Sequence, residues 1–93
     1  MRLLLIEDDA LFGDGLKSYL QADGHWVDWV KALAHASAFA TEPYDAWLLD
    51  WNLPDGQGTQ WLQRMRRQGN VTPTLLLTAR DSLNERIEGL DSG

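Results

Sequence analysis

Hydrophobic and polar positions alternate along the chain in blocks of two kinds. Short, continuous aliphatic runs are typical of strands that are buried on both faces of a parallel sheet. Stretches with an apolar residue every three or four positions predict amphipathic helices. The strands are predicted at residues 2–6, 25–30, 44–50 and 73–78. The helices are predicted at residues 10–22, 32–41 and 57–68, with a last one that carries Leu83, Ile87 and Leu90.

The strict alternation of strand and helix predicts right-handed crossovers and a parallel sheet covered by helices on both faces. Capping and glycine residues agree with the predicted ends of the helices. Asp9 is placed to cap the first helix and Gly24 to end it, while Gly69 follows the third. The strand at 25–30 is more polar than the others, which suits a position at the edge of the sheet.

Composition limits the class of protein. The chain has 93 residues, enough for one domain, with 44% hydrophobic and 24% charged residues and no cysteine. A net charge of −6 argues against direct binding of this chain to nucleic acid. No apolar run approaches the roughly 18 residues that span a bilayer, so no membrane association is predicted. The absence of cysteine agrees with a reducing compartment, and we expect a cytoplasmic protein.

Polar side chains that could form a site stand at the ends of three of the predicted strands. Glu7, Asp8 and Asp9 follow the first strand, Asp50 ends the third, and Thr78 ends the fourth. The carboxyl ends of parallel strands share one rim, where α/β proteins bind ligands. Carboxylates that come close there repel one another, and a hard cation such as Mg²⁺ relieves the repulsion. A carboxylate beside Mg²⁺ can also attack phosphorus and form an aspartyl phosphate.

Each of these residues also has a simpler structural explanation. A lone Asp at a strand end is commonly a helix cap or a solvated loop residue, and a Thr commonly bonds its own backbone. The hypothesis of a site rests on the three positions sharing one rim.

Three segments carry a resemblance to a known family. They are LLLIEDDALFGDGL at 3–16, YDAWLLDWNLPDGQG at 44–58 and TPTLLLTARDSLNERIEGLDSG at 72–93. In order and spacing they resemble the receiver domains of bacterial two-component response regulators, most closely the branch with a winged-helix DNA-binding output domain. The resemblance implies a flavodoxin-like parallel sheet of order 2-1-3-4-5. Residues 1–93 would hold the first four strands, 2-1-3-4, with the fifth strand, the fifth helix and the output domain absent.

The resemblance also implies roles for individual residues. Asp50 would be the phosphoacceptor. Mg²⁺ would be bound by Asp8, by Asp50, by the backbone carbonyl of Asn52 and, through water, by Glu7.

Two further positions belong to the switch that the family carries. Thr78 would be the switch hydroxyl, and Ala79 the small residue beside it. The family's lysine that contacts the phosphoryl group has no counterpart, since Lys17 and Lys31 stand at other places in the chain.

The function implied is phosphorelay signalling. A sensor histidine kinase would donate a phosphoryl group to Asp50, and the phosphorylated domain would control a DNA-binding output domain that regulates transcription. The chain is expected to be a self-phosphorylating switch and not a turnover enzyme. Without the family's lysine we expect phosphorylation to be slow or absent and signalling to be poor. An exposed strand edge at 74–78 predicts self-association.

Two alternatives come from other classes of protein. One is a receiver-like interaction module that is never phosphorylated. The other is a phosphatase of the haloacid-dehalogenase type, which needs a carboxylate two residues after its nucleophilic Asp; Asn52 stands at that position.

Overall fold

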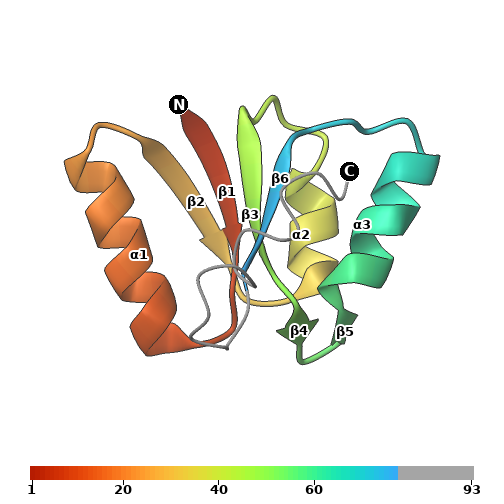
Figure 1. Ribbon diagram of the computed structural model, residues 1–93, viewed down its shortest axis with the longest axis horizontal. Helices are drawn as coiled ribbons and strands as arrows, with labels where there is room; N and C mark the ends of the chain where they lie inside the picture. The colour runs from red at the N-terminus through yellow and green to blue at the C-terminus, as the bar shows by residue number, and fades with distance from the viewer. Residues whose placement is uncertain (78–93) are drawn as a thin grey trace.

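Four parallel strands form a sheet through the middle of the molecule (Figure 1). The computed structural model describes residues 1–77. The four strands are β1 (Arg2–Ile6), β2 (Trp26–Val30), β3 (Ala46–Asp50) and β6 (Thr74–Leu77). Their order is β2-β1-β3-β6, and every neighbouring pair is parallel. The order predicted for the four long strands is therefore confirmed, with the more polar β2 at an edge.

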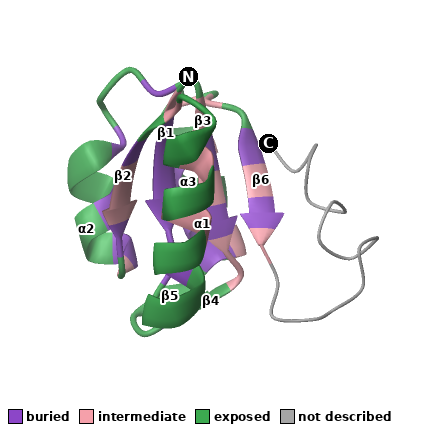
Figure 2. Cartoon of the chain, turned by 90° about the vertical axis from the view of Figure 1, so that its left-hand side faces the viewer, coloured by how far each residue is buried: buried purple, intermediate pink, exposed green. Residues whose placement is uncertain are grey.

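Within residues 1–77, three helices cover the sheet. Helix α1 (Ala10–Ala22) lies on one face, and α2 (Leu33–Phe39) and α3 (Gly58–Arg67) lie on the other (Figure 1). Because successive side chains of a strand point to opposite faces, Leu3 and Leu5 of β1 pack on the α1 side. Leu4 and Ile6 enter the larger core under α2 and α3. This two-sided burial explains the continuous aliphatic run, and most of the strand residues are buried (Figure 2).

Two tryptophans anchor the larger core. Trp47 of β3 and Trp61 of α3 are both fully buried, and their ring centroids lie 5.1 Å apart in a tilted arrangement. Such an aromatic pair contributes about 1 kcal/mol beyond the area it buries. It fixes α3 against the strand that ends at Asp50.

The helix ends follow the signals in the sequence. The amide of Phe12 donates to the Asp9 carboxylate at 3.0 Å, which caps α1. Gly24 and Gly69 have φ values of +92° and +91°, and they follow α1 and α3 in the left-handed conformation that ends a helix. The predicted last helix and the end of the fourth strand lie outside the described residues. No helix within residues 1–77 is long and apolar enough to cross a membrane.

A small hairpin follows β3, and its tip contains Pro54, Asp55 and Gly56, residue types that are common in turns. Strand β4 (Asn52–Leu53) pairs in antiparallel fashion with β5 (Gly56–Gln57). Two-residue strands leave no periodic pattern from which they could be recognised. The hairpin leads directly into α3.

Candidate metal and phosphoacceptor site

The main chain brings two strand ends to one rim of the sheet. Strands β1 and β3 are neighbours in parallel register, with Ile6 beside Leu49. The pairing of each strand with its outer neighbour continues past its end: the amide of Glu7 donates to the carbonyl of Val30 in β2 at 3.0 Å, and that of Trp51 donates to the carbonyl of Leu77 in β6 at 3.0 Å. The residues at these two strand ends are therefore held by the sheet itself.

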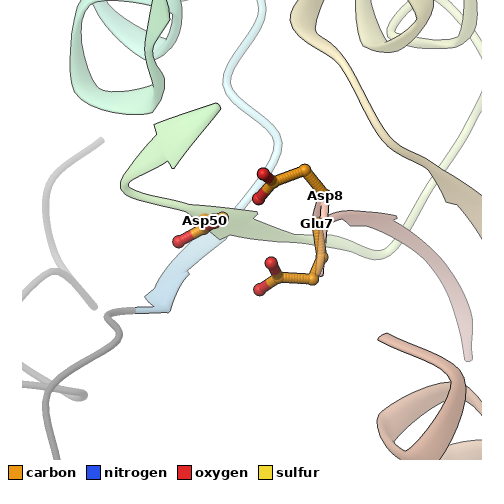
Figure 3. A group of neighbouring side chains, drawn as sticks. All are labelled: Glu7, Asp8 and Asp50. Atoms are coloured by element: carbon orange, nitrogen blue, oxygen red, sulfur yellow. The ribbon is translucent and has the colours of Figure 1, made fainter. Parts of the chain in front are cut away.

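Three carboxylates meet at this rim. One carboxylate oxygen from each of Glu7, Asp8 and Asp50 lies within 4.8 Å of the other two. Figure 3 shows Glu7 and Asp8 reaching from the end of β1 and Asp50 from the end of β3 towards a shared space. Glu7 is buried, with 4% of its surface exposed, whereas Asp50 is half-buried and Asp8 is exposed. The proximity of Asp8 and Asp50 predicted from the sequence is confirmed.

Burial and mutual repulsion disfavour the charged forms of these groups. Burial raises the pKa of the Glu7 carboxyl from 4.5 to about 7, and the negative charges of Asp50 and Asp8 act in the same direction. The amide of Asp9 opposes this rise by donating to Glu7 at 3.0 Å. Burial also raises the pKa of the Asp50 carboxyl, and the charge of Asp8 adds to it.

The donor set fits Mg²⁺. Hard carboxylate oxygens are the ligands that this ion takes in proteins, usually one or two of them together with waters and phosphate oxygens. Asp8, on the exposed side of the cluster, is accessible to water. A divalent cation there would neutralise the charge that now makes ionisation of Glu7 and Asp50 unfavourable.

Trp29 supports the acidic pair through a contact that the sequence analysis missed. Its indole Nε1 donates to the main-chain carbonyl of Glu7 at 2.8 Å. The ring fills the space over Gly13 of α1, where a Cβ atom would overlap it. In the sequence, Trp29 looks like any aromatic residue of an edge strand, so no local pattern could reveal this contact.

On the other side of the site, the main chain of Gly58 packs closely against the end of β3. Its amide donates to the carbonyl of Trp51 at 2.7 Å, and a Cβ atom at this position would overlap the carbonyl oxygen of Asp50. A residue without a side chain is required because the first turn of α3 passes directly against the end of β3.

The remaining predicted positions are distributed as follows. Asn52 is exposed in β4, two residues beyond Asp50, where it pairs with Gln57. Lys17 is on α1, and the ammonium group of Lys31 lies 5.0 Å from the centroid of the Trp29 ring. Thr78 and Ala79 lie outside the described residues.

Residues 3–93 match the response regulator receiver domain family, and the chain belongs to that family. It is 47% identical to the response regulator protein PmrA of Pseudomonas aeruginosa and 48% identical to the transcriptional regulatory protein QseB of Escherichia coli O157:H7. Both matches cover the whole of this chain. The chain spans only 42% and 43% of the length of these two relatives.

Solved structures share the fold. The receiver domain of the Francisella response regulator 1452 is 30% identical, with a TM-score of 0.84 over 99% of this chain and 77% of that one. The response regulator TrrA of Thermotoga maritima, in complex with Mg²⁺ and BeF, is 25% identical, with a TM-score of 0.79. That alignment covers 95% of this chain and 77% of TrrA. The flavodoxin-like receiver fold expected from the sequence is thus confirmed.

Proposed function

We propose that this chain accepts a phosphoryl group on Asp50 from a phosphohistidine of a partner sensor kinase, with Mg²⁺ as the cofactor. The metal ligands would be Asp8, Asp50, the backbone carbonyl of Asn52 and, through water, Glu7. The observation that carries the proposal is the approach of three carboxylate oxygens to within 4.8 Å of one another at the carboxyl rim of the sheet.

The proposed reaction is a direct transfer. A carboxylate oxygen of Asp50 attacks phosphorus, and the new O–P bond forms as the P–N bond to the histidine breaks, with the electron pair returning to the imidazole nitrogen. Asp50 must be ionised to attack, although burial and Asp8 raise its pKa. Bound Mg²⁺ would supply the positive charge that favours the ionised carboxylates and screens the phosphoryl oxygens.

The chain's own residues position the acceptor. The β-ladder and Gly58 fix the main chain of Asp50, and the Trp29 indole holds the main chain at Glu7. In this proposal, the hydroxyl of Thr78 moves towards the phosphoryl group, and Ala79 leaves space beside it. This movement would report phosphorylation to the rest of the protein.

The acceptor is tested with a small phosphodonor. The purified protein is incubated with acetyl phosphate with and without Mg²⁺, and the products are resolved on a phosphate-affinity gel. We expect Mg²⁺-dependent modification that is lost in Asp50→Asn. Asp45→Asn is the matched control, because Asp45 binds the main chain of Arg2 at the opposite rim. Unchanged modification of Asp50→Asn would contradict the assignment.

The gel experiment, together with a fluorescence measurement, distinguishes this proposal from the alternative of a non-phosphorylated interaction module. Trp51 adjoins Asp50 in the chain, so its fluorescence should change when Mg²⁺ binds. A protein that acquires no phosphate and shows no Mg²⁺-dependent change in tryptophan fluorescence would be the interaction module.

The wider role follows from the proposed chemistry. The phosphorylated domain would act as a switch, without turnover, that controls a DNA-binding output and so transcription, in the cytoplasm. The name of QseB as a transcriptional regulatory protein supports this role. The net charge of −6 supports the inference that this stretch itself does not bind nucleic acid.

Self-association through β6 is part of the same proposal. In the part of the chain that the structure describes, β6 pairs with β3 alone and is the outer strand of the sheet. Light scattering at rising protein concentration tests this, and a monomer throughout would refute it.

A further inference from the structure

Helix α2 takes its N-terminal cap from a distant residue. Its own N-cap position is Ala32, which has an extended backbone but no side-chain hydrogen bond to the helix. The two oxygens of Asp55 replace it, accepting from the amides of Leu33 at 2.8 Å and Ala34 at 2.9 Å. These bonds lower the pKa of the Asp55 carboxyl, so the group is ionised at neutral pH.

Asp55, which caps α2, belongs to the β4–β5 hairpin that follows Asp50. Asp55 lies at the tip of the β4–β5 hairpin, between the paired residues Leu53 and Gly56. Leu53 is buried in the core, and a Cβ atom at Gly56 would lie 3.2 Å from Leu33. The hairpin is therefore held against the start of α2 by a core side chain, a close backbone approach and a two-oxygen carboxylate contact.

The hairpin begins immediately after the acceptor strand. Its first residue, Asn52, is two residues from Asp50 and supplies the main-chain carbonyl that the proposed function assigns to Mg²⁺. A carboxylate that binds two neighbouring amides fixes both the distance and the direction of the tip. A shift of the tip would be transmitted to Asn52 through its antiparallel partner in β5.

We propose that Asp55 is a positioning residue for the acceptor site: its contact with the start of α2 fixes the β4–β5 hairpin, and through it the carbonyl of Asn52 beside Asp50. This inference rests on the proposed function. Asp55 binds the amides of Leu33 and Ala34 and is not among the proposed metal ligands, so its effect on binding would be indirect.

The test separates positioning of the loop from stabilisation of α2. In Asp55→Ala, both the helix cap and the tether of the loop are lost. In the double variant Ala32→Ser with Asp55→Ala, a serine at the N-cap restores a local cap, but the loop stays untethered. The matched control is Asp45→Ala, which removes a carboxylate that accepts from a main-chain amide at 2.7 Å at the opposite rim.

Three quantities are measured for each protein: Mg²⁺ affinity from tryptophan fluorescence, thermal stability, and hydrogen exchange of the Ala34 amide. Asp55→Ala should weaken Mg²⁺ binding about tenfold, the typical effect of losing a residue that orients a metal ligand. It should also speed exchange at Ala34. The double variant should recover stability and exchange protection while Mg²⁺ binding stays weak, and Asp45→Ala should bind Mg²⁺ as the wild type does.

Each other outcome overturns the inference in a distinguishable way. Recovery of Mg²⁺ affinity in the double variant would show that Asp55 only caps α2. If the wild-type protein binds Mg²⁺ and Asp55→Ala binds it with the same affinity, the positioning role is rejected while the proposed function stands. A wild-type protein that binds no Mg²⁺ would reject the proposed function and this inference together.

Discussion

The main chain of Gly58 passes directly against the carbonyl group of Asp50, and its amide donates to Trp51 at 2.7 Å. On the other side of the cluster, the indole of Trp29 lies over Gly13 and donates to Glu7. Both ends of the acidic rim therefore depend on a glycine that allows a close approach. At the scale of single residues, the geometry of the carboxylates is set by neighbours that carry no charge.

Substitution of Gly58 tests this dependence. A methyl group at this position meets the backbone oxygen of Asp50, which cannot turn aside as a side chain can. We expect Gly58→Ala to lower the free energy of unfolding by about 1–3 kcal/mol, the usual cost of overpacking, and to weaken Mg²⁺ binding. Urea denaturation and a Mg²⁺ titration measure the two effects.

Gly15 offers the control. It lies within α1, and a Cβ atom there would have nothing within 4 Å. Gly15→Ala should leave Mg²⁺ binding unchanged and raise stability by up to about 1 kcal/mol, because alanine favours the helix. Equal stability of Gly58→Ala and the wild type would contradict the steric argument.

Helix α2 shows how the elements support one another. Seven residues are too few for a helix that is stable alone. Besides the contact with Asp55, Trp61 of α3 donates to Ser37 at 2.9 Å, and Asn70, after α3, donates to the carbonyl of Ala40 at 2.9 Å. The segment around α3 thus holds α2 at its start, middle and end. The contact at the start reaches the β4–β5 hairpin, whereas the connection between α3 and β6, which holds Asn70, lies at the opposite rim (Figure 1).

This difference between the two ends of α2 leads to a prediction. Asn70→Ala removes the donor to Ala40 and the acceptor for the amide and hydroxyl of Thr72. We expect a loss of about 1–3 kcal/mol in the free energy of unfolding, since half-buried polar groups lose their partners. Mg²⁺ affinity should stay at the wild-type value. A Mg²⁺ affinity that falls as far as in Asp55→Ala would show that the two ends of α2 are not independent.

For the molecule as a whole, the cluster of carboxylates at one rim of the sheet makes stability depend on pH. The chain carries a net charge of −6, and three of its carboxylates converge within 4.8 Å. Folding buries Glu7 and raises its pKa from 4.5 to about 7. The folded state therefore binds a proton more tightly than the unfolded state does, and its stability depends on pH.

The sign of this dependence follows from the raised pKa. The contribution of Glu7 to the free energy of unfolding is fully present below pH 4.5 and is lost as the pH rises towards 7. In EDTA, we expect the free energy of unfolding to fall by roughly 2–3 kcal/mol across this range, at about 1.4 kcal/mol per unit of pKa shift. Urea denaturation at a series of pH values measures it.

Two comparisons check the cause. Glu7→Gln should flatten the pH dependence, because glutamine does not titrate. Saturating Mg²⁺ should raise stability most at pH 7, where it replaces the lost proton, by about 2.7 kcal/mol at a hundredfold excess over the dissociation constant. A slope that is the same in Glu7→Gln as in the wild type would assign the effect to other groups.

Within residues 1–77, the sequence alone was enough to predict the three helices, the four strands of the main sheet and the order of these strands. The aliphatic run at Leu3–Ile6, the apolar spacing at 10–22 and the cap at Asp9 are local signals, readable within a few residues. The alternation of strand and helix, together with the family resemblance, predicted the parallel order and so placed Asp8 and Asp50 at neighbouring strand ends. These inferences held because burial on both faces produces continuous apolar runs, and their alternation with helical spacing is typical of parallel α/β sheets.

The residues that support the site from outside it are recognised only from contacts in the folded chain. Asp55 reads as a turn residue, yet it binds Leu33 at a separation of 22 residues, and Asn70 binds Ala40 at a separation of 30. The contact of Trp29 with Glu7 also spans 22 residues. The pKa of Glu7 depends likewise on charges and burial that exist only after folding. Contacts between distant segments leave no periodicity in the chain. The residues that support the acidic rim can therefore be identified only once α2, the hairpin and the sheet are packed together.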